Sequence, residues 1–137
     1  MSKYPYIVNI DDMIGKPFVW GGRGPDSYDC GGVVNEVLNR IGIIYPDEVT
    51  PSIEASAYDK LKQHKNNYWK RQSIEGLPDA KMGVLMQNGE TWHVGIVLDM
   101  FGNFIHIREK SHVCINNTTS SPWKHFILGY YIYESVA

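Results

Sequence analysis

The chain has 137 residues, of which 43% are hydrophobic and 20% are charged, and this composition predicts a single globular domain over residues 1–137. The 13 basic and 15 acidic side chains give a formal net charge of −2, so no basic excess favours nucleic acid as a partner. No stretch is apolar enough to span a membrane, and the two cysteines are too few for a disulfide framework.

The N-terminal segment differs from a secretory signal peptide. Residues 1–12 have no apolar core, and Asp11 and Asp12 bring acidic charge close to the start. We therefore expect that the protein is made in the cytoplasm and is not exported by the general secretory route.

Residues 17–34 form a glycine-rich loop that ends at Cys30 and leads into an amphipathic run. The apolar residues of this run recur at helical spacing and predict a helix from about residue 30 to residue 41, ending near Gly42: Val33, Val34, Val37, Leu38 and Ile41. Cys30 would lie at the helix N-terminus, where unpaired backbone N–H groups and the helix dipole favour a thiolate. Because the thiolate is the nucleophilic form, Cys30 is a candidate nucleophile.

The remainder of the chain predicts one more helix and then a series of strands. Thr50-Pro51-Ser52 provides a cap for a helix over about residues 53–63. Short β-type runs follow over residues 82–87, 91–98, 103–108, 113–115 and 128–133. Asn88-Gly89 predicts a hairpin turn after the first run. Helices followed by an antiparallel meander predict an α+β fold in which the helices pack on the sheet.

A cysteine nucleophile needs a general base, usually histidine, and often a polar group that orients the imidazole. Of the five histidines, His93 and His106 each interrupt an apolar strand, which would hold the ring rigidly. The other three are expected in exposed or loop-like surroundings: His64, His112 and His125.

The strand register supports a pairing of the two histidines. If residues 99–102 form the turn, His106 lies opposite Gly95 and on the same face as His93. A loop one residue longer or shorter would place the two histidines on opposite faces. With the helix N-terminus packed above their common face, Cys30, His93 and His106 would line up as nucleophile, base and orienting group.

Each of these residues also has an ordinary structural interpretation. A single buried cysteine is usually an inert apolar side chain, which is our interpretation of Cys114, and a histidine in a strand is more often structural. Cys30, His93 and His106 could also bind zinc together with His112 or Cys114, but no C-x-x-C or H-x-x-x-H pair supports such a site. The combined order and geometry of the loop, the cysteine and the two histidines favour an enzyme.

These motifs resemble the NlpC-type cysteine peptidases, which are compact relatives of papain. Residues 17–22, Pro-Phe-Val-Trp-Gly-Gly, and residues 29–32, Asp-Cys-Gly-Gly, match the nucleophile motif of that family. Residues 93–96, His-Val-Gly-Ile, and residues 104–106, Phe-Ile-His, match its base strand and its third catalytic strand. The resemblance covers about residues 14–110, and the order of cysteine before histidine argues against the circularly permuted acyltransferase relatives.

The resemblance implies a papain-like α+β fold, with N-terminal helices packed on a C-terminal antiparallel sheet of about five or six strands. It also implies hydrolysis of an amide bond in cell-wall peptides, often between D-glutamate and a diamino acid, without a metal or cofactor. By analogy, Cys30 attacks the carbonyl, His93 transfers the proton, and His106 orients His93, while the backbone N–H of Cys30 helps to stabilise the oxyanion. The residues expected near the substrate are Phe18, Trp20, Asp29 and Gly31. Asp29 is expected either to organise the loop or to meet the amino group of the substrate.

Two positions depart from the family pattern. Phe18 replaces a frequent tyrosine, and Gly31 replaces the serine that helps to hold the N-terminal end of the substrate. These departures motivate an alternative hypothesis, a non-catalytic structural or assembly module of a phage-like tail on the same fold. A third hypothesis is a different amide or thioester acyl chemistry, such as deamidation.

The setting that we expect is a phage-like particle. Small members of the family without a signal peptide or wall-binding repeats resemble the peptidases encoded with phage tails or gene transfer agents. The expected partners are therefore the peptidoglycan stem peptide and tail proteins of a phage-like particle, and the expected location is the virion or its tail.

Overall fold

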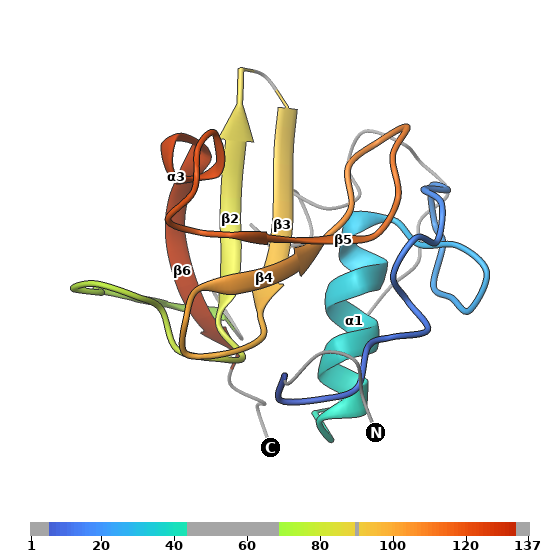
Figure 1. The fold of residues 1–137 in the computed structure, drawn as a ribbon, viewed down its shortest axis with the longest axis horizontal. Helices are drawn as coiled ribbons and strands as arrows, with labels where there is room; N and C mark the ends of the chain where they lie inside the picture. The colour runs from blue at the N-terminus through green and yellow to red at the C-terminus, as the bar shows by residue number, and fades with distance from the viewer. Residues whose placement is uncertain (1–5, 44–68, 90, 134–137) are drawn as a thin grey trace.

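The computed structural model describes residues 6–43, 69–89 and 91–133 (Figure 1). Its elements, in chain order, are helix α1 (Cys30–Arg40), strands β1 (Trp69–Gln72), β2 (Gly83–Asn88), β3 (Thr91–Val97), β4 (Asn103–His106) and β5 (Cys114–Asn117), helix α3 (Trp123–Phe126) and strand β6 (Ile127–Tyr133). The predicted helix over residues 53–63 lies outside the described residues. The five predicted strands are all present with small shifts at their ends, whereas β1 and α3 were not predicted.

The strands form one antiparallel sheet in the order β1-β6-β2-β3-β4-β5. Strands β2 to β5 follow one another as the predicted meander. Strand β6 then returns to pair with the free edge of β2, and β1 pairs with the outer edge of β6. The structure therefore confirms the predicted α+β class and an antiparallel sheet of six strands.

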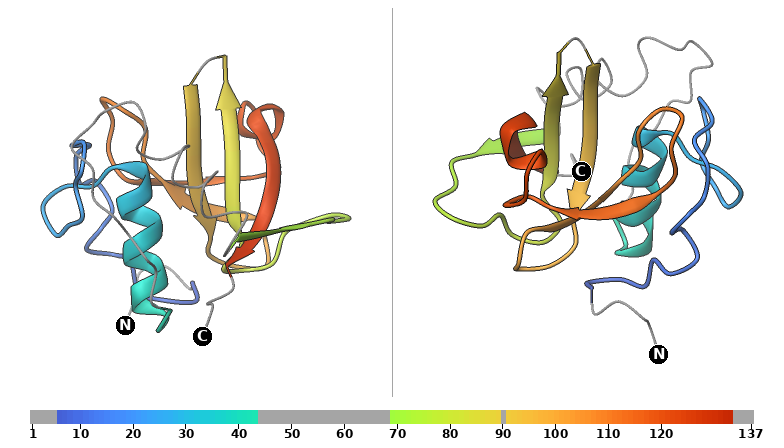
Figure 2. Two further views of the ribbon diagram at one scale, coloured as in Figure 1. Left: turned by 180° about the vertical axis from the view of Figure 1, so that it is seen from behind. Right: turned by 45° about the horizontal axis from the view of Figure 1, so that its top comes forward.

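The two helices pack on opposite faces of this sheet (Figure 2). Successive side chains of a strand point to opposite faces, so each strand contributes to two separate cores. The core under α1 includes Val33, Val37, Leu38, Val94, Ile96 and Ile105. The core under α3 is formed by Met82, Val84, Met86, Val97, Phe104 and Trp123. Neither helix in the described ranges has the length or hydrophobicity that a membrane span requires.

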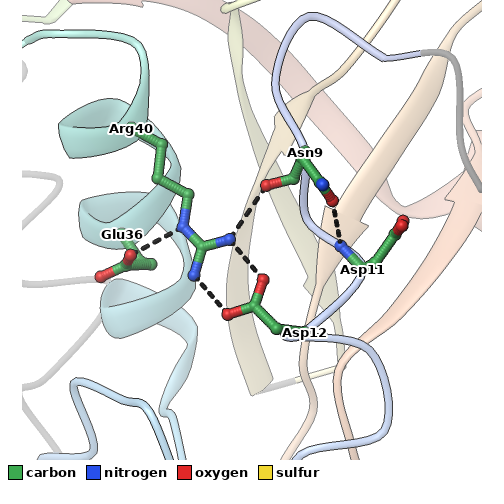
Figure 3. Close-up of polar contacts among 5 residues, drawn as sticks. All are labelled: Asn9, Asp11, Asp12, Glu36 and Arg40. Atoms are coloured by element: carbon green, nitrogen blue, oxygen red, sulfur yellow. Dashed lines mark hydrogen bonds and ion pairs between the residues drawn. The ribbon is translucent and has the colours of Figure 1, made fainter. Parts of the chain in front are cut away.

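Arg40 ties the N-terminal segment to the last turn of α1 (Figure 3). Its Nη1 and Nη2 donate to the two carboxylate oxygens of Asp12 at 2.6 and 2.7 Å, and Nη1 also donates to the carbonyl oxygen of Asn9 at 2.9 Å. Its Nε donates to Glu36, one turn earlier in the helix, at 2.7 Å. The paired hydrogen bond from Arg40 lowers the pKa of Asp12. This fork geometry is the strong form of an ion pair, and it fixes the segment that leads into the glycine-rich loop.

The first turn of α1 packs against the glycine-rich loop with no room for a side chain at one position. A Cβ atom added to Gly32 would overlap the backbone carbonyl oxygen of Gly22. A Cβ added to the neighbouring Gly31 would meet ordinary contacts, 3.6 Å from Asp29 Oδ1 and 3.8 Å from Arg23 Nη2. The two adjacent glycines therefore differ sharply in what they tolerate.

This difference gives a paired test of the loop–helix contact. Gly32→Ala should reduce the free energy of unfolding by about 3 kcal/mol, because backbone atoms must shift to admit the methyl group. Gly31→Ala should change it by less than about 1 kcal/mol, since alanine fits and is a better helix former. Urea denaturation followed by circular dichroism measures both values. Equal effects of the two substitutions would contradict the close packing of Gly32 on Gly22.

Candidate active site

The position of Cys30 is set by the residue that precedes it. Asp29 is the N-cap of α1, and its Oδ1 accepts a hydrogen bond from the Gly32 N–H at 2.7 Å and from Arg23 Nη1 at 2.6 Å. Its Oδ2 accepts from the Gly21 N–H at 2.9 Å. Asp29 is only 1% exposed. Its carboxylate therefore joins the glycine-rich loop to the helix start and fixes the backbone that carries Cys30.

The two histidines occupy the predicted register. The Leu98 N–H donates to the Asn103 carbonyl at 2.7 Å, and His106 pairs with Gly95 in the β3–β4 ladder. The Nε2 atom of His93 and the Nδ1 atom of His106 are 2.6 Å apart, which is a short hydrogen-bond distance. The predicted turn over residues 99–102 and the shared face of the two histidines are confirmed.

Gly95 lies where strands β3 and β4 approach each other closely beside the two histidines. A Cβ atom at this position would lie 2.9 Å from the Ile105 carbonyl oxygen and 3.1 Å from the Cβ of His106. Because such contacts are too close for a real side chain, Gly95 permits the tight approach of β3 and β4 beside the histidine pair.

The apolar side of α1 packs on the face of the sheet opposite to the two histidines. The valines of α1 pack with Val94, Ile96 and Ile105, which point to the opposite face from His93 and His106. The physical reason is that these strand residues are the apolar ones on the alternate face, so the helix buries them.

Cys30 and His93 nevertheless line the same cavity, which has a volume of about 530 Å³. The Cys30 thiol interacts with the backbone N–H of Val94, the residue that follows His93. Phe18 and Trp20 also line the cavity, and their rings meet edge to face with centroids 4.8 Å apart. The opening is of the size typical for small-molecule and peptide subsites.

The predicted site residues thus separate into three groups. Cys30, His93, Phe18 and Trp20 line the cavity, and His106 lies directly behind His93. Asp29 is buried beneath the loop, where its hydrogen bonds support the loop-organising role that we considered for it. Gly31 is not among the residues that line the cavity, and its missing side chain would face Asp29 and Arg23 instead.

Several residues at the far end of the site were not predicted from the sequence. His106 Nε2 lies 2.7 Å from Asn116 Oδ1, and Cys114 Sγ lies 3.6 Å from the same nitrogen. Cys114, which we interpreted as inert, is therefore a neighbour of His106. Arg108 and Trp123 line the cavity, with the Arg108 guanidinium 5.2 Å from the centre of the Trp123 ring. In the sequence, Cys114 and Asn116 are two residues apart, which indicates that they share a face if both lie in one strand. Their position beside His106 could be inferred only with the pairing of β4 with β5.

The geometry of the two histidines argues against their sharing a zinc ion. Two nitrogens at about 2.0–2.1 Å from one tetrahedral zinc would be roughly 3.4 Å apart. His93 Nε2 and His106 Nδ1 are closer than this, at 2.6 Å, and face each other. Among residues 6–43, 69–89 and 91–133, no three histidine, cysteine or acidic side chains are placed to hold a metal ion.

The model of the NlpC/P60 family matches residues 15–131, which is most of the chain. The chain belongs to the NlpC/P60 family. It is 47% identical over 30 residues to a protein named "Probable endopeptidase p60" from Listeria grayi, a match that covers 22% of this chain and 6% of that protein.

A solved structure supports the same fold. A protein described as similar to a lipoprotein of the NLP/P60 family, from Staphylococcus aureus subsp. aureus Mu50, aligns with a TM-score of 0.61 and 22% identity. The alignment covers 90% of this chain and 38% of that one. The NlpC/P60 domain described here therefore spans well under half the length of either relative.

Burial keeps the Cys30 thiol and the His93 imidazole of this NlpC/P60 domain neutral. Burial raises the pKa of the Cys30 thiol to about 12, and the charge of Asp29 adds to this increase, although nearby backbone N–H groups oppose it. Burial lowers the pKa of His93 well below its ordinary value, with further decreases from His106 and Arg108. Burial also lowers the pKa of His106 to about 4, although the hydrogen bond to Asn116 opposes this shift. Near neutral pH the site therefore holds a thiol and two neutral imidazoles, not the thiolate that the helix dipole alone predicts.

Alkylation of Cys30 tests this neutral state. Because the pKa of the thiol is raised to about 12, the rate of reaction with iodoacetamide should keep increasing beyond pH ~8.5, where a free cysteine levels off. The rate is measured across a pH series, with peptide mass spectrometry to separate Cys30 from Cys114. An apparent pKa below that of a free cysteine would show a preformed thiolate–imidazolium pair and contradict the prediction.

The pKa of His106 also predicts how stability depends on pH. Folded His106 has a pKa of about 4, whereas a histidine in the unfolded chain has a pKa of about 6.5. The unfolded state therefore binds a proton more readily between these values. The free energy of unfolding should fall as the pH falls through this window, by about 3 kcal/mol from His106 alone.

Urea denaturation at a series of pH values measures this loss in wild type and in His106→Gln. The variant should show a shallower decrease, while the exposed His125→Gln control should follow wild type. The same pH dependence in wild type and His106→Gln would overturn the assignment to His106.

Proposed function

We propose that this protein is a cysteine peptidase that hydrolyses an amide bond in bacterial cell-wall peptides through Cys30, His93 and His106. The observation that carries the proposal is the 2.6 Å contact between His93 and His106, with His93 and Cys30 lining one cavity. Membership of the NlpC/P60 family supports a cell-wall peptidase, as does the match to a probable endopeptidase of Listeria grayi. The cysteine mechanism is our inference from the geometry.

The first half-reaction requires a proton transfer to His93. His93 faces His106 through Nε2, so its other ring nitrogen, Nδ1, is the atom that accepts the proton of the Cys30 thiol. The sulfur then attacks the carbonyl carbon and forms a tetrahedral oxyanion. The backbone N–H of Cys30 then stabilises that oxyanion, a role that its position at the start of α1 supports. Collapse of the oxyanion breaks the C–N bond, and His93 gives its proton to the leaving amine.

The second half-reaction regenerates the enzyme. A water molecule donates its proton to His93 and attacks the thioester carbonyl, and the C–S bond breaks as the sulfur takes back a proton. His106 keeps the His93 ring in position through both steps, since His106 itself is fully buried. The neutral resting state suits this route, because the base acts only when a substrate carbonyl is present to be attacked.

The cavity supports a peptide substrate. Aromatic rings from the glycine-rich loop and from α3 provide apolar walls, and Arg108 adds a cationic group. Such a lining can hold an extended peptide and pair with a carboxylate on it, and cell-wall stem peptides carry several carboxylates. Phe18 and Trp20 are the residues that we propose contact the substrate from the loop side.

The alternative is a non-catalytic structural or assembly module of a phage-like tail, which Phe18 and Gly31 motivated. Phe18 lines the cavity, so the absence of a hydroxyl group there favours this alternative. Gly31 gives it less support, because a side chain there would face Asp29 and Arg23. The association with a phage-like tail stays a prediction that rests on the family resemblance, and co-purification with tail proteins tests it.

Cleavage of purified cell-wall stem peptides, followed by liquid chromatography and mass spectrometry, tests the proposed function. Cys30→Ala and His93→Ala should each reduce the rate by about 10³-fold or more, because the residues of such a unit depend on one another. His125→Ala, an exposed histidine away from the cavity, should keep the wild-type rate. Cleavage that is unaffected by Cys30→Ala would refute the cysteine mechanism. Stable binding of tail proteins without any cleavage would favour the structural module.

A further inference from the structure

Strand β5 places two side chains on the face that carries His106. Cys114 pairs directly with His106 in the β4–β5 ladder, and Asn116 pairs with Phe104. Because side chains alternate along a strand, Cys114, Asn116 and His106 lie on the same face. Asn116 Oδ1 is 2.7 Å from His106 Nε2, and Cys114 Sγ is 3.4 Å from the same oxygen.

We propose that Asn116 is a positioning residue that fixes the protons of both histidines, so that His93 presents an unprotonated Nδ1 toward Cys30. The effect on catalysis rests on the proposed function, whereas the effect on proton positions follows from the hydrogen-bond chain itself.

Asn116 determines which nitrogen of His106 carries the proton. An amide oxygen can only accept a hydrogen bond, so His106 Nε2 must donate to Asn116 Oδ1. Burial raises the pKa of the Cys114 thiol. The protonated thiol therefore donates to the same oxygen. The His106 N–H and the Cys114 S–H both donate to Asn116 Oδ1. These two hydrogen bonds keep Oδ1 facing His106 and the NH₂ group turned away from it.

The second step carries this choice to His93. Neutral His106 with its proton on Nε2 has a lone pair on Nδ1, which can only accept. His93 Nε2 lies 2.6 Å from that lone pair and therefore carries the proton that the two nitrogens share. Neutral His93 is then left with an unprotonated Nδ1, the form that can take a proton from Cys30. An amide turned by 180° would reverse every proton in the chain and leave His93 unable to act as the base.

The packing around His106 makes Asn116 difficult to replace. The His106 ring packs against the rings of Trp123 and Phe104, with ring centroids 4.6 and 4.7 Å away, and these contacts hold its orientation. His106 has no exposed surface, so bulk water does not reach Nε2 as a substitute acceptor. Removal of the Asn116 amide therefore leaves a buried N–H donor whose remaining acceptor, within the part of the chain that the structure describes, is the weakly accepting sulfur of Cys114.

The direct test is ¹⁵N NMR of histidine-labelled protein near neutral pH, which distinguishes protonated from unprotonated ring nitrogens. In wild type, we expect protons on Nε2 of both His93 and His106 and none on Nδ1 of either. Asn116→Leu should redistribute the His106 and His93 protons between their two nitrogens. Asn116→Asp keeps an accepting oxygen and should retain the wild-type pattern. A proton on His93 Nδ1 in wild type, or an unchanged pattern in Asn116→Leu, would overturn the proposal.

Kinetics provides the second measurement. Asn116→Leu should lower kcat by about 10–100-fold with little change in KM, as expected when an outer partner of a working histidine is lost. Asn116→Asp should restore most of kcat and shift the acidic limb of the pH profile upward, since a carboxylate raises the pKa of His106. A merely structural role would not move this limb.

Asn117→Leu is the matched control for both measurements. Asn117 is the next residue of β5, but its amide donates to the Phe101 carbonyl and to Asn103 on the other face. This variant should keep the wild-type proton pattern and pH profile. If wild type fails to cleave any wall peptide, the proposed function fails, and the NMR experiment still decides the role of Asn116.

Discussion

The buried carboxylate of Asp29 is the interaction on which the rest of the site depends. It accepts hydrogen bonds from the backbone of Gly21 and Gly32 and from the side chain of Arg23. Gly21 and Arg23 belong to the glycine-rich loop and Gly32 belongs to α1, so the Asp29 side chain joins the loop to the helix. Without that acceptor, the N–H groups of Gly21 and Gly32 would lose this hydrogen-bond partner near the core, which is costly in a low-dielectric interior. The hydrogen bonds to the Asp29 carboxylate therefore determine the position of Cys30, the next residue.

The two faces of the sheet carry different residues near the cavity. One face of β3 and β4 is apolar and is buried under α1, and the other carries His93 and His106. On the histidine face, the short helix α3 packs Trp123 against His106 and lines the cavity with Trp123 and Phe126. By packing on the opposite face, α1 supplies stability along its length and brings only its first residue, Cys30, to the cavity. The arrangement explains how a rigid core and an accessible site coexist in one small domain.

The sequence was informative where local rules decide the structure. The four-residue turn before Asn103 fixed the register, and this register alone placed His106 and His93 side by side. The helix α1 was predicted from the spacing of its own apolar residues, which is also a local feature of the sequence. The face on which α1 packs was not predictable in this way, because it depends on which apolar strand residues remain uncovered in the assembled sheet. Strand β1 and Asn116 escaped detection for the same reason, since each gains its role from a non-local strand pairing.

Burial lowers the reactivity of Cys30 and His93, but it helps to fix the positions of the histidine protons. It disfavours both the Cys30 thiolate and the His93 imidazolium, and so it opposes spontaneous formation of the reactive pair. The same burial excludes water from His106, which makes the hydrogen bond to Asn116 the determinant of where its proton lies. A solvent-exposed histidine would exchange its protons freely between the two nitrogens. Burial thus lowers the intrinsic reactivity of Cys30 and His93 and at the same time fixes the proton positions of the histidines. Fixed proton positions are what the proposed mechanism requires of His93, which must accept a proton on Nδ1.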